Sequence, residues 1–112
     1  MGTSYITEQT PAGDKESLTV STVAVGFTAA KISINQVGGF HKRAVRAFVT
    51  VETNPVRFWY DGSTPTSTVG HHLNSGDSVT IDGEGNVTNF KVIRSSEAAA
   101  DATLMITYFY NA

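Results

Sequence analysis

The sequence contains no cysteine, and that absence excludes several kinds of site. Without cysteine there can be no disulfide scaffold, no thiolate zinc site and no cysteine nucleophile. Charged residues are also few, at 16% of 112 residues, and the formal net charge is −2. The one basic cluster, His41-Lys42-Arg43 with Arg46, is small. Because a clustered basic surface supplies most nucleic-acid affinity, we expect no nucleic-acid partner.

Long hydrophobic runs are missing as well. No stretch approaches the roughly 18 apolar residues that a membrane-spanning helix requires. The opening residues, MGTSY, contain neither a basic leader nor an apolar stretch, so they lack the pattern of a signal peptide. We therefore expect a soluble protein with no membrane partner.

Thr, Ser, Asn and Gly fill the composition instead, and this mixture favours strands and turns. The clearest alternation puts one set of residues on one face of a strand (Val45, Ala47, Val49, Val51) and a second set on the other (Arg46, Phe48, Thr50, Glu52). Further strands are predicted within residues 18–27, 31–34, 56–60, 78–81, 87–94 and 103–110. Residues 95–100 are compatible with one helical turn, with Ser96 as its cap.

Short strands separated by turn signals predict an all-β protein, an antiparallel β-sandwich of jelly-roll-like form with seven or eight short strands. The polar residues 1–17, which include the breaker cluster Pro11-Ala12-Gly13-Asp14, are predicted to form an N-terminal arm. Residues 18–112 are predicted to form a single β-sandwich domain.

Few residue patterns suggest chemistry. Adjacent histidines in a strand point to opposite faces, so His71 and His72 are poorly placed to share a metal. The stretch from Gly70 to Asp77 faintly resembles the metal motif of cupins, but it lacks their His-x-His and the following Glu. The acidic residues Asp77, Asp82 and Glu84 do not have the spacing of a calcium loop, and no helix is predicted after Gly83-Glu84-Gly85 to bind a phosphate.

A Ser–His–Asp triad assembled in space stays open as an alternative, although the sequence has no nucleophile elbow. We expect no catalytic residues, no metal and no cofactor, and we do not expect an enzyme.

Several strands carry apolar or anchor-type side chains on a second face. In residues 56–60, a core formed by Val56, Phe58 and Tyr60 would direct Arg57 and Trp59 outward. Both faces of residues 103–110 are apolar, and such a strand needs cover on both sides. A loop of the same chain is one source of cover, and a neighbouring subunit is the other. The candidate interface residues are Tyr5, Ile6, Phe48, Arg57, Trp59, Met105 and Phe109.

The second half of the chain resembles a group of small virion proteins of tailed bacteriophages. The resemblance covers about residues 43–110 and depends on Arg57, Tyr60-Asp61-Gly62-Ser63-Thr64-Pro65-Thr66, Gly70-His71, Leu73, Gly76-Asp77, Asn89-Phe90-Lys91-Val92-Ile93-Arg94 and Ala102-Thr103-Leu104-Met105-Ile106-Thr107-Tyr108. The first 40 residues have no match in this group. The resemblance implies a small β-sandwich or jelly-roll component of a phage particle and no catalytic residues.

These observations predict a capsid decoration (cement) protein on the exterior of the phage head. Its partners would be further copies of itself, as a trimer, and the major capsid or other virion proteins. One alternative is another virion part, such as a head–tail connector, collar, tail or fibre accessory. The other alternative is a cupin- or lectin-like binding module.

Overall fold

The computed structural model describes residues 12–35 and 41–111 of the chain. This part contains eight strands and two short helices. The strands are β1 (Ala12–Val20), β2 (Ser33–Asn35), β3 (His41–Thr53), β4 (Val56–Trp59), β5 (His71–Leu73), β6 (Ser78–Asp82), β7 (Lys91–Arg94) and β8 (Ala102–Tyr110). The helices are α1 (Ala29–Ile32) and α2 (Glu84–Asn89). Neither described helix has the length and apolar character needed to cross a lipid bilayer.

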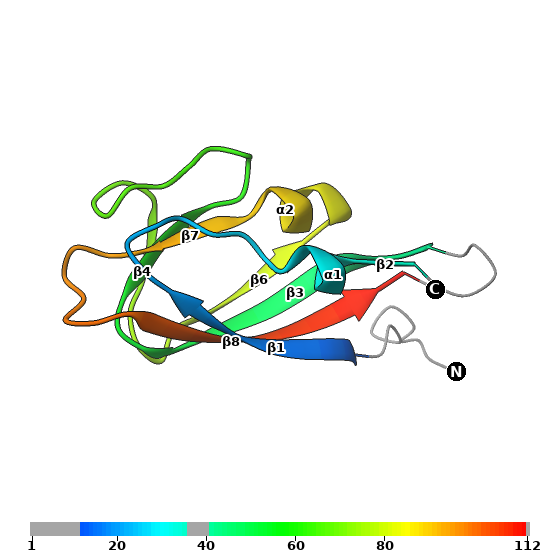
Figure 1. The fold of residues 1–112 in the computed structure, drawn as a ribbon, viewed down its shortest axis with the longest axis horizontal. Coiled ribbons are helices and arrows are strands. Elements are labelled where there is room, and N and C mark those ends of the chain that lie inside the picture. Colours follow the sequence, from blue (N-terminus) through cyan, green and yellow to red (C-terminus); the bar gives the residue numbers. More distant parts are fainter. Residues whose placement is uncertain (1–11, 36–40, 112) are drawn as a thin grey trace, which may run out of the picture.

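The strands form two antiparallel sheets. In the larger sheet β8 lies between β1 and β3, and β3 also pairs with β2 and β6. The smaller sheet has the order β5–β4–β7. Figure 1 shows β4 and β7 in the upper layer and β1, β8 and β3 in the lower one. The predicted mainly β, sandwich-like, antiparallel architecture is confirmed.

The hydrophobic core lies between the two sheets. Leu104, Ile106 and Tyr108 of β8 are at most 2% exposed, while Met105 between them is 45% exposed. This alternation is what a strand with one buried face requires. From the smaller sheet side, Phe90 stacks on Phe27 with ring centroids 4.3 Å apart.

The alternation predicted for β3 is confirmed for Ala47, Val49 and Val51, which are at most 1% exposed. It is wrong for Val45, which is only partly buried. The pairing of β3 with β8 shifts between Ala44 and Arg46, so a β-bulge adds one residue to β3 at this point. Ala44 therefore takes the buried position that the sequence pattern gave to Val45.

Residues 12–17, which the sequence pattern places in the arm, belong to β1. Two of the polar side chains in this segment, Asp14 and Glu16, have partners in other elements of the chain. Asp14 pairs with Lys31 of α1 at 2.9 Å, and Glu16 accepts a hydrogen bond from the Tyr108 hydroxyl. Burial of Tyr108 and the nearby Glu16 carboxylate raise the pKa of the Tyr108 hydroxyl. Residues 1–11 of the predicted arm lie outside the described residues.

The helices do not fall where the sequence pattern put one. Residues 95–100 form turns and bends, because the buried Ser95 hydroxyl bonds to Glu97 instead of Ser96 capping a helix. A short helix, α2, does follow Gly83, contrary to the expectation for Gly83-Glu84-Gly85. The strands predicted within residues 18–27, 31–34 and 87–94 are shorter than expected. β1 ends at Val20, α1 occupies Ala29–Ile32, and α2 occupies Glu84–Asn89, so that β7 begins only at Lys91.

A pair of neighbouring substitutions tests the assignment of faces in β8. Leu104→Ala removes a fully buried side chain, so we expect it to lower the free energy of unfolding by about 2–5 kcal/mol. Met105→Ala acts on the outer side, so we expect a change of about 0.5 kcal/mol or less at low protein concentration. Urea denaturation followed by Trp59 fluorescence measures both changes. Equal losses from the two substitutions would contradict the assignment.

Candidate functional site

The outer side of the smaller sheet is covered by the chain itself. The loop of residues 61–70, which Figure 1 shows in green above β4 and β7, crosses this side. Pro65 in this loop is fully buried, and Ile93 of β7 is only 9% exposed. The Ser96 amide donates to the Ser67 carbonyl at 2.9 Å, which ties the loop to the segment after β7.

Arg57 on β4 holds the end of this loop. Its guanidinium donates a 3.1 Å hydrogen bond to the Gly70 carbonyl, and its side chain is 21% exposed. Gly70 has a φ of 141°, and an added Cβ would lie 3.2 Å from Arg57 and from the Phe58 backbone. Glycine is therefore required at this close approach. Arg57 lies on the outer side of β4, as predicted. Its guanidinium, however, bonds to the Gly70 carbonyl of the same chain and not to another protein.

Trp59 is half-buried against aromatic neighbours. Its ring meets the His71 ring edge-on, with the two ring centroids 5.0 Å apart. The centroid of the His71 ring also lies 6.0 Å from that of Tyr60. Pairs of this geometry add modest stability beyond burial. Val56 and Phe58 are buried as predicted, whereas Tyr60 is 41% exposed and leaves the core.

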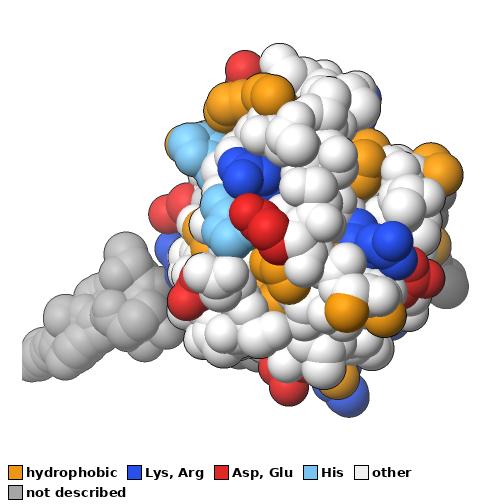
Figure 2. All heavy atoms as spheres, turned by 90° about the vertical axis from the view of Figure 1, so that its left-hand side faces the viewer, with side chains coloured by type: hydrophobic (Ala, Val, Ile, Leu, Met, Phe, Trp, Pro, Cys, Tyr) orange, Lys and Arg blue, Asp and Glu red, His pale blue; other side chains and the backbone are white. Residues whose placement is uncertain are grey.

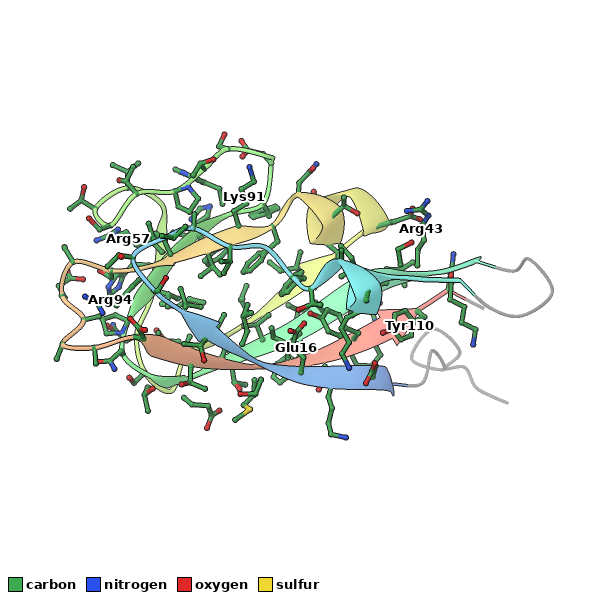
Figure 3. The ribbon with its side chains drawn as sticks, in the orientation of Figure 1. Glu16, Arg43, Arg57, Lys91, Arg94 and Tyr110 are labelled. Carbon is green, nitrogen blue, oxygen red and sulfur yellow. The ribbon has the colours of Figure 1, made fainter. Side chains whose placement is uncertain are left out.

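The most chemically suggestive cluster surrounds Glu97. Its carboxylate accepts a hydrogen bond from Ser95 and lies 3.0 Å from His72 Nε2 and 4.0 Å from the Arg57 guanidinium. The Ser95 hydroxyl, then His72 and Arg57, lower the pKa of the Glu97 carboxyl. Figure 3 places Arg57 and Arg94 at this end of the sandwich.

The order of contacts in this cluster does not match a hydrolytic triad. In a triad the histidine lies between the nucleophile and the acid. Here Glu97 lies between Ser95 and His72, so the serine hydroxyl has a carboxylate partner and no histidine base. The cluster is suited to joining the loop after β7 to β5.

The residues considered for a metal are separated by the fold. The pairing of β4 with β5 aligns His72 with Arg57 and His71 with Phe58, so the two histidines face opposite sides as predicted. Within residues 12–35 and 41–111 no group of three His, Asp or Glu side chains is arranged to hold a metal ion. The side chain of His41 lies outside the described residues.

The three acidic residues considered for calcium have other partners. Asp77 accepts a 2.8 Å hydrogen bond from the Asn74 amide, which closes a turn. Asp82 pairs with Arg46, and Glu84 pairs with Arg43, both at 3.3 Å.

At the end of the molecule that carries the loops, the exposed hydrophobic side chains do not form one continuous patch. Figure 2 shows this end, with histidine side chains beside basic and acidic ones and hydrophobic side chains in separate spots. White atoms, which include the backbone and the neutral polar side chains, cover most of the view. A docking surface based on apolar contact is therefore poorly supported at this end.

The outer side of the larger sheet is different, because no described loop or helix covers it. We call it the exposed sheet face. Its residues come from four strands: Lys15, Ser17 and Thr19 of β1; Thr103, Met105, Thr107 and Phe109 of β8; Arg46, Phe48 and Thr50 of β3; and Ser78, Thr80 and Asp82 of β6. Phe48 is 40% exposed and Met105 is 45% exposed. A shallow depression of about 380 Å³ lies between them, and Lys15 and Ser17 line its β1 side.

The strand register places the large side chains of this face close together. Phe48 is paired with Thr107, so Met105 and Phe109 are its diagonal neighbours on β8. The Arg46 guanidinium lies 5.7 Å from the centre of the Phe109 ring. Large apolar side chains thus lie in the middle of the face, while threonine, serine and charged residues surround them.

The structure brings together three of the seven candidates predicted from the sequence, namely Phe48, Met105 and Phe109. Arg57 and Trp59 lie on the smaller sheet, and Tyr5 and Ile6 lie outside the described residues. Further residues line the depression that the sequence pattern did not single out as interface candidates, among them Lys15, Ser17, Thr50 and Thr107. The alternation of threonine with apolar residues in β3 and β8 was the available signal for the two threonines.

Comparison with known proteins adds no relative: no family model, no curated protein and no solved structure matches the chain.

The Glu97 cluster leads to a pH-dependence prediction. A carboxyl whose pKa is lowered by folding stabilises the protein above its ordinary value of 4.5, and this contribution is lost as the pH falls through the folded-state pKa. We expect Glu97→Gln to lower the unfolding midpoint at pH 7, and we expect the difference from the wild type to shrink below pH 4.5. Thermal unfolding at a series of pH values measures this. Glu52→Gln on the opposite sheet is the control. A gap that stays constant down to acid pH would rule out the carboxylate as its cause.

Proposed function

We propose that this chain is a structural protein of a bacteriophage particle, a capsid decoration protein that stabilises the assembled head. The exposed sheet face is the observation that carries the proposal. The chain covers the outer side of its smaller sheet with its own loop, yet it leaves Phe48 and Met105 uncovered on the larger one. A face with an apolar centre and a polar rim is typical of a protein interface.

The resemblance to small phage virion proteins supplies the particular setting. It extends over β3 to β8, the strands that build most of both sheets. The acidic net charge suits a position outside a DNA-filled shell, because a protein that lines the interior would benefit from basic residues. A protein that binds the assembled shell and not its free subunits stabilises the shell by mass action.

We also propose that the sandwich is a jelly roll. In that fold one sheet has the strand order first, eighth, third, sixth, and the other sheet has the order second, seventh, fourth, fifth. The larger sheet has the order β1–β8–β3–β6, and the smaller one has β7–β4–β5. The segment around Val25 supports this order if it is counted as the second strand in place of β2. Its backbone bonds to Val92 of β7 are 2.8 and 2.9 Å long.

Copy number in the particle tests the proposed role. Quantitative mass spectrometry of purified phage particles, with the major capsid protein as the internal standard, should find the chain in a ratio near that of the capsid subunits. Removal of the gene should leave heads that form but lose DNA sooner on heating. A few copies per particle would instead indicate a portal, tail or fibre part. Complete absence from purified particles would refute a virion role.

Metal analysis tests the cupin-like alternative. Because His71 and His72 face opposite sides of β5, we expect the purified protein to carry no stoichiometric metal. We also expect addition of Zn²⁺, Mn²⁺ or Ni²⁺ to leave its unfolding temperature unchanged. The His71→Ala/His72→Ala double variant is the control. A metal bound at one per chain and lost in that variant would favour the binding-module alternative.

A further inference from the structure

The exposed sheet face has a pattern of large and small side chains that is complementary to itself. Two of its rows cross the central strands β8 and β3. In one row Thr107 of β8 is paired with Phe48 of β3, and in the next Met105 of β8 is paired with Thr50 of β3. Each row therefore pairs one large side chain with one threonine. The large side chain is on β3 in the first row and on β8 in the second.

We propose that a second copy of this chain occupies the exposed sheet face, through a two-fold axis that runs along the strands between β8 and β3. This dimer replaces the trimer expected from the sequence. The two-fold rotation places β3 of one copy over β8 of the other and keeps the rows in register. Phe48 then lies over the partner's Thr107, and Met105 lies over the partner's Thr50. Large side chains meet small ones in both rows, as in a well-packed core, and the contact is isologous, so the assembly closes as a dimer.

The depression on the face fits this arrangement. It is bounded by Phe48 and Met105 and has Thr107 and Thr50 in its lining. Over the partner's Thr107, the Phe48 ring would enter the space between the partner's Met105 and the partner's Phe109. The rotation also exchanges Arg46 with Phe109 in the adjoining row, so each guanidinium would meet an aromatic ring of the other copy.

The charges at the two edges of the face are complementary under the same rotation. Lys15 lies on β1, in the row of Thr107, Phe48 and Thr80. The rotation places it over the partner's Thr80 on β6, one row from the partner's Asp82. Asp82 keeps 70% of its side chain exposed beside Arg46, so it is accessible to a second cation. Symmetry forms the Lys15–Asp82 contact twice in the dimer.

The size of the face sets the expected strength. Four strands spaced about 4.8 Å apart and about eight residues of 3.4 Å each give a face on the order of 500 Å² per copy. Two such faces bury roughly 1,000 Å², which is near the lower limit for a specific interface. We therefore expect a reversible dimer in free solution. Attachment to neighbouring sites on a capsid would raise the local concentration and favour the same contact.

The inference concerns the same face as the proposed function and rests on it, but the two can fail separately. Sedimentation equilibrium of the full chain up to roughly 1 mM should show a monomer–dimer equilibrium. Phe48→Asp should raise the dissociation constant about 30-fold or more, because it places a charge at the centre of the contact. Val69→Asp is the matched control, since Val69 is 52% exposed on the loop of the smaller sheet and should leave the constant unchanged.

A charge exchange tests the orientation of the two copies. Lys15→Glu and Asp82→Lys should each weaken the dimer several-fold, and the double variant should regain most of the loss. Circular dichroism at low concentration checks that each variant is folded. A monomer at 1 mM, a trimer, or dimerisation that Phe48→Asp leaves intact would overturn the inference. These results would leave the proposed virion role intact. If the chain forms the dimer but is absent from purified particles, the proposed function is refuted and the dimer is not.

Discussion

Two stacked sheets have four faces, and the cover of each face is the constraint on which this structure depends. Two faces meet in the core, where Leu104 and Ile106 of β8 oppose side chains such as Val92 and Phe58. The third face is covered by the loop of residues 61–70. The fourth, the exposed sheet face, is left to solvent within the described chain. Apolar side chains in the middle of such a face have a cost in water, which contact with another protein removes.

The polar clusters of the molecule contribute to its structure in a consistent way. Glu97, Ser95 and His72 connect the loop after β7 with β5, and Arg57 connects β4 with Gly70. Asp14 and Glu16 perform a similar role for β1, where α1 and Tyr108 supply their partners. The hydrogen bonds and ion pairs of these polar groups thus hold loops and strands together.

Much of the fold could be predicted from the sequence, because period-two alternation is a local signal. The strands β3, β4, β6 and β8 and their buried faces follow from it, apart from the bulge at Val45 and the exposed Tyr60 after β4. Bulges and strand ends depend on the pairing of distant segments, so they left no local sign. The same is true of residues 12–17. Their polar side chains indicate an arm in the sequence, but Asp14 and Glu16 pair with residues of α1 and β8, which are distant in the sequence.

The candidate site could be predicted only in part. Alternation identified Phe48, Met105 and Phe109 as outward-facing residues, but their arrangement depends on the register between β3 and β8. Arg57 and Trp59 have the residue types of interface anchors, yet the loop of residues 61–70 and His71 cover much of both. A sequence pattern shows which face of a strand a residue occupies. Whether that face is later covered by a loop of the same chain is a property of the tertiary structure.

Oxidative footprinting of Met105 measures whether the exposed sheet face is covered by another polypeptide in the particle. Hydroxyl radicals oxidise accessible methionine, and peptide mass spectrometry locates the sulfoxide. We predict rapid oxidation of Met105 in the dilute free protein and strong protection in the assembled particle, while Tyr60 near the loop of residues 61–70 reacts at similar rates in both. Equal oxidation of Met105 in the two states would contradict the claim that the exposed sheet face is buried against another polypeptide.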